Sequence, residues 1–438
     1  MTALPSSTSV LVIGGGPAGA TAAALLARQG IDVVLLERAP DPRYHVGESL
    51  LPSALEVLDL MGASEKVERA GFVRKPGTEL EWGGEPWRLH FGESTGKHRH
   101  GLHVERSRFD PLLRAHAASQ GASVFEGHEV RAIAWEAGRP VRAKWRNVGS
   151  GAEGDIAFGH LIDATGRAGL VSTGYMKDRR YHRSFKNIAI WGYWKNVDRG
   201  PADFRGAMRV GAVKNGWLWV IPLQYGLSNV GLVIRKEHFL RQGERGLGAI
   251  YDDGLRSSHL VSTVLASARL GTTLRTEPVY SYAAASFAGP GYFQCGDAAC
   301  FLDPALAAGV HLAMLSAVLA AAAIGSIRRG ELPEERSVAY FDARYRSAYT
   351  RHVKMVSALH DPRLGKDDYF REAQRLTSAD LKAFDPSRAF VQLASGMEDL
   401  DDTSCEDHVY LVTRPGLRLA ELPPAEAAPP LAMASSHR

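Results

Sequence analysis

The chain has 438 residues, of which 45% are hydrophobic and 23% are charged, and its formal net charge is +4. This composition disfavours disordered, collagen-like and nucleic-acid-binding classes. Three cysteines are too few for a disulfide framework, and the longest apolar run, residues 312–324, is too short to span a bilayer. We therefore expect a cytoplasmic protein with no membrane segment, no nucleic-acid partner and no metal site.

The first forty residues alternate between strand and helix signals. Residues 10–13 form a short apolar strand, a glycine-rich turn follows, and an alanine-rich helix runs to about Gln29. A second strand, residues 32–36, ends at Glu37. This order of strand, turn, helix, strand and acid is that of a nucleotide-binding βαβ unit.

The turn contains the pattern G-x-G-x-x-G. Its glycines permit a tight turn, close approach of the backbone to a pyrophosphate and close packing of helix on strand. The free N–H groups at the helix start attract a diphosphate, and an acid at the end of the next strand can bind the ribose hydroxyls. The pattern predicts a dinucleotide site at Gly14, Gly16, Ala18, Gly19, Glu37 and Arg38.

Two later strands end in short polar loops, D-A-T-G from Asp163 and G-D at Gly296 and Asp297. Together with the glycine turn and a segment containing Arg106, they resemble the FAD monooxygenase superfamily of the para-hydroxybenzoate hydroxylase type. The resemblance implies an α/β fold, with a Rossmann-like FAD-binding domain, an inserted β-sheet substrate domain and a helical C-terminal region. It assigns Asp163, Gly296, Asp297 and Arg106 to FAD binding. Asp297 would bind the ribityl chain of the flavin.

Four further segments narrow the resemblance. Residues 217–222 read W-x-W-x-I-P, residues 47–52 read G-E-S-L-L-P, residues 71–77 surround Lys75, and residues 303–313 begin with D-P. The set resembles the flavin-dependent halogenases, in their phenol and pyrrole branch. It implies functional roles for Glu48, Ser49, Lys75, Trp217, Trp219, Pro222, Asp303, Pro304, Gly309 and Val310.

The resemblance implies that FADH2, O2 and chloride or bromide give hypohalous acid, which reaches Lys75 beside an aromatic small-molecule substrate. Lys75 as an ammonium could hydrogen-bond the oxidant, or as a neutral amine it could form a chloramine. The sequence does not distinguish between these two roles. Trp217, Trp219 and Pro222 belong to the tunnel for the oxidant and the substrate, and Glu48 and Ser49 belong to the flavin loop.

The segment after Asp303 would supply the halide site. Gly309 and Val310 begin a helix whose free N–H groups suit an anion, and Asp303 with Pro304 orders the loop before them. Ala307 stands where the family has serine.

We expect an FAD-binding domain over residues 1–330, with β-rich insertions at about 76–100 and 175–280. A helical region follows over 331–420, and residues 421–438 form a disordered tail. The acidic run 398–402 is predicted to be a solvated loop. We assign no second G-x-G-x-x-G to a nicotinamide cofactor, so either a separate flavin reductase supplies FADH2 or NAD(P)H binds transiently.

Three alternatives stay open. The chain could be an FAD-dependent aromatic hydroxylase, a flavin-dependent reductase of isoprenoid double bonds, or a flavin-binding protein that has lost catalysis. Many halogenases of this branch act on acyl groups tethered to an acyl or peptidyl carrier protein, and the mild positive charge permits docking of such an acidic partner.

Overall fold

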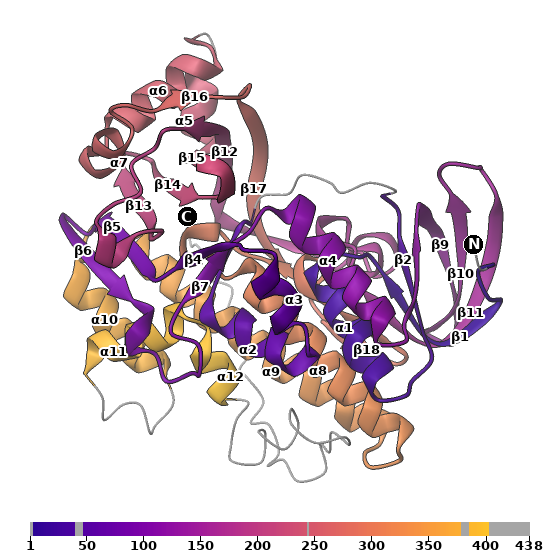
Figure 1. Ribbon diagram of the computed structural model, residues 1–438. Helices are drawn as coiled ribbons and strands as arrows, with labels where there is room; N and C mark the ends of the chain where they lie inside the picture. Colours follow the sequence, from indigo (N-terminus) through magenta and orange to yellow (C-terminus); the bar gives the residue numbers. More distant parts are fainter. Residues whose placement is uncertain (1–2, 40–46, 243–244, 378–384, 403–438) are drawn as a thin grey trace, which may run out of the picture.

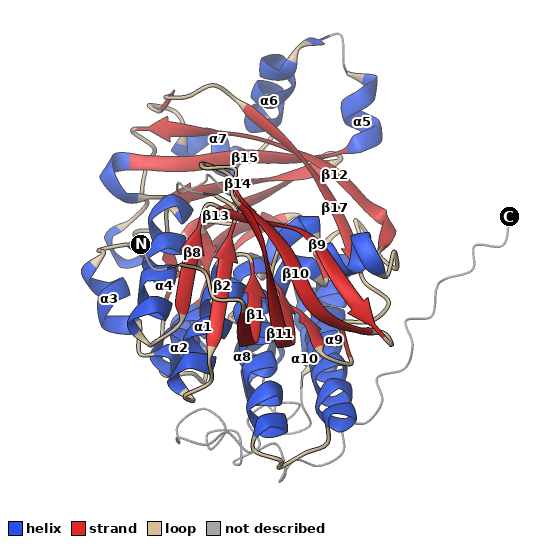
Figure 2. Cartoon of the chain, turned by 90° about the vertical axis from the view of Figure 1, so that its right-hand side faces the viewer, coloured by secondary structure: helices blue, strands red, loops and turns tan. Residues whose placement is uncertain are grey.

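The computed structural model describes residues 3–39, 47–242, 245–377 and 385–402. The predicted tail 421–438 and the end of the predicted helical region therefore lie outside the described residues. Two large sheets organise the rest, with helices packed below and around them (Figures 1 and 2).

The first sheet has the parallel core that the N-terminal pattern predicts. Its strand order is β18-β19-β11-β1-β2-β8, and β1 pairs in parallel with both β2 and β11. Antiparallel β9 and β10 extend it beside β11, as the front of Figure 2 shows. The strands are β1 (Ser7–Ile13), β2 (Val33–Glu37), β8 (Ser123–Glu126), β9 (His128–Glu136), β10 (Arg139–Asn147), β11 (Glu153–Asp163), β18 (Ala288–Gly289) and β19 (Tyr292–Gln294).

Helices with small residues cover one face of this sheet. Helix α1 (Pro17–Arg28) packs against α8 (Gly309–Arg328), and most residues of both are buried. Helix α8 is long and apolar enough to cross a membrane by length and composition, but 89% of its apolar window is buried inside the protein. The other helices of this part are α2 (Pro52–Met61), α3 (Ser64–Arg69) and α4 (Arg106–Ser119).

The second sheet forms the β-rich part of the chain. Its order is β20-β17-β12-β15-β14-β13-β5-β6, mostly antiparallel, with β5 and β6 forming a hairpin within the β-rich segment expected at about 76–100. The strands are β5 (Gly77–Trp82), β6 (Glu85–His90), β12 (Arg180–Lys195), β13 (Met208–Val213), β14 (Gly216–Pro222), β15 (Leu227–Arg235), β16 (Arg269–Leu270), β17 (Arg275–Ala283) and β20 (Cys300–Phe301). Helices α5 (Lys236–Arg241), α6 (Leu247–Arg256) and α7 (His259–Val264) cover its far side (Figure 1).

A small antiparallel sheet connects the two large ones. Strand β7 (Gly101–His103) lies between β3 (Ser49–Leu50) and β4 (Val73–Lys75). The strands approach closely at Gly101, where an added Cβ would lie 2.1 Å from the carbonyl oxygen of Leu50. This sheet brings two segments that are separate in the sequence, those of Ser49 and Lys75, to the same place.

The C-terminal part is helical, with α9 (Glu334–Leu359), α10 (Lys366–Leu376), α11 (Pro386–Ala394) and α12 (Met397–Asp402). Here one prediction is wrong. The acidic run 398–402 belongs to α12, and Glu398 and Asp399 are 1% and 2% exposed instead of solvated. Buried cationic and imidazole partners make this burial of Asp399 possible, as described below.

Candidate functional site

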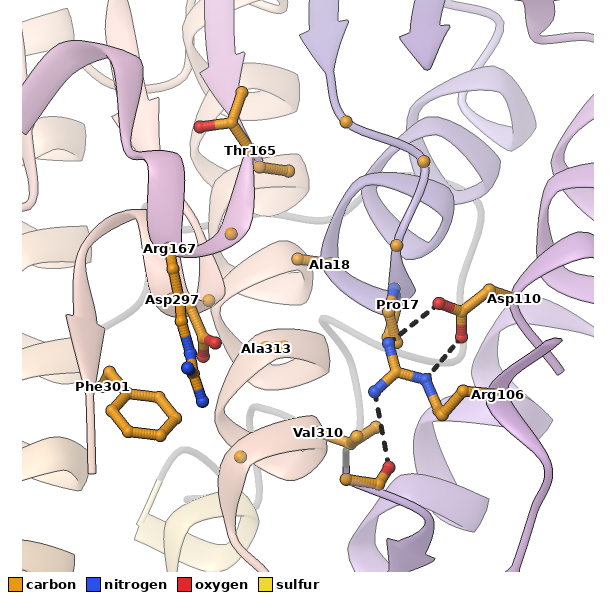
Figure 3. Close-up of a pocket in the computed structure, with 18 of the residues that line it drawn as sticks. Pro17, Ala18, Arg106, Asp110, Thr165, Arg167, Asp297, Phe301, Val310 and Ala313 are labelled. Carbon is orange, nitrogen blue, oxygen red and sulfur yellow. Dashed lines mark hydrogen bonds and ion pairs between the residues drawn. The ribbon is translucent and has the colours of Figure 1, made fainter. Parts of the chain in front are cut away.

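A cavity of about 490 Å³ opens where the first sheet meets the second. Its size is in the usual range for small-molecule sites. The glycine turn, the D-A-T-G and G-D loops, the start of α8 and the strand β14 all contribute lining residues. Figure 3 shows that residues distant in the sequence, such as Arg106 and Asp297, lie on opposite sides of it.

The glycine turn has the two properties that a pyrophosphate site needs. A Cβ on Gly14 would lie 2.2 Å from Ala164 O, and one on Gly19 would lie 1.9 Å from Gly14 O, so both glycines are required for packing. Gly16 is different, because an added Cβ would meet nothing within 4 Å. The space at Gly16, at the N-terminus of α1, is therefore open to the cavity.

Glu37 stands at the end of β2, as the pattern predicts. Its Oε2 accepts a hydrogen bond from Gly15 N at 2.7 Å, and its Oε1 accepts one from Ala39 N at 2.8 Å. The carboxylate thus shapes the glycine turn, and Glu37, Arg38 and Ala18 all line the cavity.

Arg106 projects into the cavity from the start of α4. Its guanidinium makes a two-point contact with Asp110, at 2.7 and 2.8 Å, and a longer one of 3.4 Å with Gly47 O (Figure 3). Asp110 therefore fixes the arginine side chain. Sequence reasoning did not assign Asp110, although the i, i+4 spacing of the two residues could have revealed the pair.

The two aspartates of the later loops have different positions. Asp163 is fully buried and accepts hydrogen bonds from Thr165 N, Thr165 Oγ1 and Val171 N, so it holds the D-A-T-G turn. The cavity is lined by residues 164–168 of that turn, and not by Asp163 itself. Gly296 and Asp297 do line it, with Arg167 beside Asp297 in Figure 3.

Glu48 lies in the cavity wall and is 2% exposed. Tyr193 Oη donates to its Oε1 at 2.9 Å and Asn229 Nδ2 donates to its Oε2 at 2.6 Å. Burial raises the pKa of Glu48 to about 7, against the lowering effect of both donors and of Arg106. A group that titrates near neutrality beside a cavity is a recurrent feature of functional sites.

Lys75 is buried next to this wall, 1% exposed. Its Nζ donates a hydrogen bond to Ser49 Oγ at 2.9 Å and lies 5.1 Å from the centre of the Phe91 ring. Burial lowers the pKa of Lys75 to about 7. Ser49 lines the cavity while Lys75 does not, so the serine is the link between the lysine and the cavity.

The two tryptophans of W-x-W-x-I-P extend the cavity into the second sheet. Their rings are 5.6 Å apart, and both line the cavity. Trp219 Nε1 donates to Asn229 Oδ1 at 2.9 Å, which connects it to the Glu48 carboxyl. Trp217 Nε1 has no partner among the residues that the structure describes. Pro222 ends β14, and Ile221 lines the cavity in its place.

The loop before α8 has the expected order. Asp303 accepts from Ala305 N at 3.2 Å and from Asn187 Nδ2 at 2.8 Å, and Pro304 follows it at the start of a short 3₁₀ turn. Helix α8 begins at Gly309, which lines the cavity together with Val310. Ala307 occupies the left-handed region, with a φ of 56°, and also lines the cavity.

Several contributors were not predicted from the sequence. Tyr193 and Asn229 hold Glu48, but their positions in β12 and β15 carry no motif. Met208 lines the apolar extension of the cavity. Only the strand pairing of the second sheet brings these residues to the site.

Comparisons with known proteins agree with this geometry. Residues 7–353 match the FAD binding domain family. The chain is 42% identical over 406 residues to a Tryptophan 2-halogenase of Chondromyces crocatus, covering 91% of this chain and 77% of that protein. It is 38% identical over 379 residues to the flavin-dependent halogenase armH3 of Armillaria mellea, covering 82% of this chain and 75% of the other.

The chain belongs to the flavin-dependent halogenases. A solved structure, that of the myxobacterial chondrochloren halogenase CndH, superimposes with a TM-score of 0.76 at 33% identity, covering 92% of this chain and 93% of that one. The protein is thus an oxidoreductase that uses FAD, and the predicted α/β FAD-binding fold is confirmed. The hydroxylase, isoprenoid reductase and non-catalytic alternatives are set aside.

Proposed function

We propose that this halogenase transfers chlorine or bromine to an electron-rich aromatic ring, with Lys75 as the residue that delivers the halogen. The observation that carries the proposal is the Ser49–Lys75 hydrogen bond of 2.9 Å, which places a buried amine directly behind the wall of the flavin cavity. Bound as FADH2, the cofactor supplies the O2 chemistry that oxidises a halide to hypohalous acid.

The residues around the cavity divide the task of holding the flavin. The open space at Gly16 and the N-terminus of α1 suit the pyrophosphate, and Glu37 suits the ribose. Arg106, fixed by Asp110, and Asp297 stand at the cavity beyond them. Gly309 and Val310 offer free N–H groups at the start of α8, which is the place we assign to the halide.

Lys75 would act as the neutral amine. Burial lowers its pKa to about 7, so a large share of the side chain is unprotonated at neutral pH. An amine attacks hypohalous acid to give an N–halogen bond and water, and the halogen then passes to the ring as the amine takes up a proton. Trp217 and Trp219 enclose the path and keep water away from the oxidant.

Glu48 and its partners would maintain the flavin side of the wall. The Trp219–Asn229–Glu48–Tyr193 chain of hydrogen bonds fixes the shape of the wall between the flavin cavity and the second sheet. We also propose that the chain divides into an FAD-binding domain with β-rich insertions and a helical C-terminal region. A reducing, cytoplasmic location is a further part of the proposal. Both described cysteines, Cys295 and Cys300, are free and buried.

The proposed substrate class is a phenol or a pyrrole-type ring, in natural-product biosynthesis such as that of an antibiotic. The relative from Chondromyces crocatus is named a Tryptophan 2-halogenase. Tryptophan is therefore a separate candidate substrate, which the phenol and pyrrole proposal does not include and which the test below must cover. The net charge of +4 agrees with an acidic carrier protein as the partner that presents the substrate.

Flavin-dependent halogenases generally rely on a separate flavin reductase, which the test must supply. Purified enzyme, a reductase, FAD, NADH, O2 and bromide or chloride would be incubated with tryptophan, phenols and pyrroles, each free and, for acids, loaded on a carrier protein. Mass spectrometry reads the halogen isotope pattern. Halogenation of a carrier-loaded acid and not of the free acid supports the tethered substrate, and the reverse result removes the carrier protein from the proposal.

A further inference from the structure

The first turn of α8 belongs to a buried polar network as well as to the cavity. His311 follows Val310 directly, is 1% exposed and does not line the cavity. Its Nδ1 is 2.8 Å from Ser53 Oγ, and its Nε2 is 2.8 Å from Asp399 Oδ2. The halide-facing turn is thus bonded on its other side to α2 and α12.

Asp399 is the centre of this network. Its Oδ2 also accepts from His352 Nε2 at 2.7 Å, and its Oδ1 contacts the Arg351 guanidinium. Burial alone would raise the pKa of Asp399, but His352, Arg351 and His311 hold it well below the usual range. Burial lowers the pKa of His311. The carboxylate is therefore ionised and the His311 ring neutral.

These charge states settle the directions of the hydrogen bonds. His311 Nε2–H donates to Asp399, which leaves Nδ1 as an acceptor for the Ser53 hydroxyl. Ser53 is the second residue of α2, and the strand before that helix carries Ser49, the partner of Lys75. One chain of contacts therefore runs from Asp399 through His311 and Ser53 to the segment that binds the lysine.

We propose that Asp399 is a positioning residue for the halide site, acting through His311. By fixing the tautomer and orientation of His311, it holds the N–H groups of Gly309 and Val310 at a set position relative to Ser49 and Lys75. This inference rests on the proposed function, since it assumes that the start of α8 binds the halide. It gives the C-terminal helix α12 a role in halogenation.

Two other interpretations of the cluster fit less well. Ser53, His311 and Asp399 resemble a hydrolytic triad, but Ser53 is 0% exposed and does not line the cavity described above. Two histidines and an aspartate could hold a metal ion. However, the Nε2–Oδ2 separations of 2.7 and 2.8 Å are those of hydrogen bonds, and Arg351 already neutralises the carboxylate.

The test compares Asp399→Asn and Ser53→Ala with Gln392→Ala as a matched control. Gln392 is equally buried and ties α11 to Thr95 through a hydrogen bond of 2.6 Å. Each variant, loaded with FAD, is titrated with bromide while the flavin absorption spectrum is recorded. The FAD dissociation constant, the melting temperature and the KM for bromide are measured alongside.

We expect Asp399→Asn to raise the bromide concentration at half-saturation about tenfold, the change that a loss of ~1.4 kcal/mol in binding gives. Ser53→Ala should raise the bromide concentration at half-saturation by a smaller factor. Both variants should bind FAD with nearly the affinity of the wild type. Gln392→Ala should lower only the melting temperature. The proposal is overturned by unchanged bromide binding in folded Asp399→Asn, or by an equal change in Gln392→Ala at equal loss of stability.

Further results distinguish a failure of the positioning role of Asp399 from a failure of the proposed function. If Asp399→Asn does not fold, Ser53→Ala decides, and normal bromide binding in that variant overturns the proposal. One equivalent of tightly bound metal in the wild type, lost in Asp399→Asn, would also overturn it. If the wild type binds bromide but halogenates no substrate, the proposed function fails while the positioning role is still judged by the titration.

Discussion

Lys75 Nζ donates a hydrogen bond to Ser49 Oγ across 2.9 Å, and both residues are buried, 1% and 4% exposed. Ser49 is part of the flavin cavity wall and Lys75 lies behind it. The lysine is therefore within one hydrogen bond of the cavity that we propose for the flavin, and it is shielded from bulk water. This relationship has consequences for stability as well as for activity.

The burial of Lys75 should lower the stability of the protein at neutral pH. In the folded state its pKa is about 7, below the 10.5 of a free lysine, so the unfolded chain binds more protons between these values. Stability should rise as the pH rises from 7 toward 10.5, by roughly 1.4 kcal/mol for each pKa unit of the shift. Lys75→Met removes this pH dependence. The free energy of unfolding of this variant should therefore exceed that of the wild type most clearly at pH 7.

The measurement is urea unfolding of both proteins from pH 7 to pH 10. The excess stability of Lys75→Met should shrink as the pH rises. A difference that grows with pH would mean that Lys75 is charged in the folded protein, which contradicts the role of a neutral amine.

Halogenation should increase with pH through about 7 if the amine form of Lys75 reacts. Glu48 titrates in the same range, since burial raises its pKa to about 7, so the profile of the wild type does not identify the group. Glu48→Gln removes one of these two titrating groups and leaves Lys75. The increase should persist in Glu48→Gln at saturating FADH2, and a flat profile there would assign the pH dependence to Glu48.

The two tryptophans should differ when each is replaced by phenylalanine. Trp219→Phe removes the hydrogen bond that Trp219 Nε1 donates to Asn229 Oδ1, which should cost about 0.5–1.5 kcal/mol beyond the change in packing and loosen the hold on Glu48. Trp217 has no hydrogen bond to lose among the described residues, so Trp217→Phe should cost less. Thermal unfolding of the two variants measures their loss of stability. Equal losses would show that the packing of the rings, and not the hydrogen bond of Trp219, determines their contribution to stability.

The glycine turn offers a test of cofactor binding without catalysis. Gly16→Ala should fold normally, because its Cβ meets no protein atom, but should lose most FAD affinity through contact with the pyrophosphate. Gly14→Ala should misfold or unfold easily, because its Cβ would lie 2.2 Å from Ala164 O. Far-UV circular dichroism and FAD fluorescence titration check both, and tight FAD binding by Gly16→Ala would displace the pyrophosphate from the proposed position.

Sequence patterns predicted the parts of the site that are local in the chain. The turn at Gly14, the alanine-rich helix after it and the acid at Glu37 each depend on neighbours within a few tens of residues. Periodicity and turn chemistry act over that range. The motif around Lys75 pointed to the residue but not to its burial, because the pairing of β4 with β7 decides the environment.

Contacts between distant segments could not be predicted in this way. Asn229 reaches Glu48 across 181 positions in the sequence. The acidic run in α12 was expected to be solvated because a carboxylate without a partner does not stay buried. Its partners, His311, His352 and Arg351, come from α8 and α9. Only the assembled fold shows that Asp399 is neutralised.

The most direct test of the account compares the wild type with Lys75→Met at equal FAD occupancy. Both are given a reductase, NADH, O2, bromide and the best substrate, with a chemical trap for free hypobromous acid in parallel reactions. The account predicts a brominated ring from the wild type, and from Lys75→Met continued NADH consumption with trapped oxidant and no brominated ring. Normal bromination of the substrate by Lys75→Met would contradict the central role of the lysine.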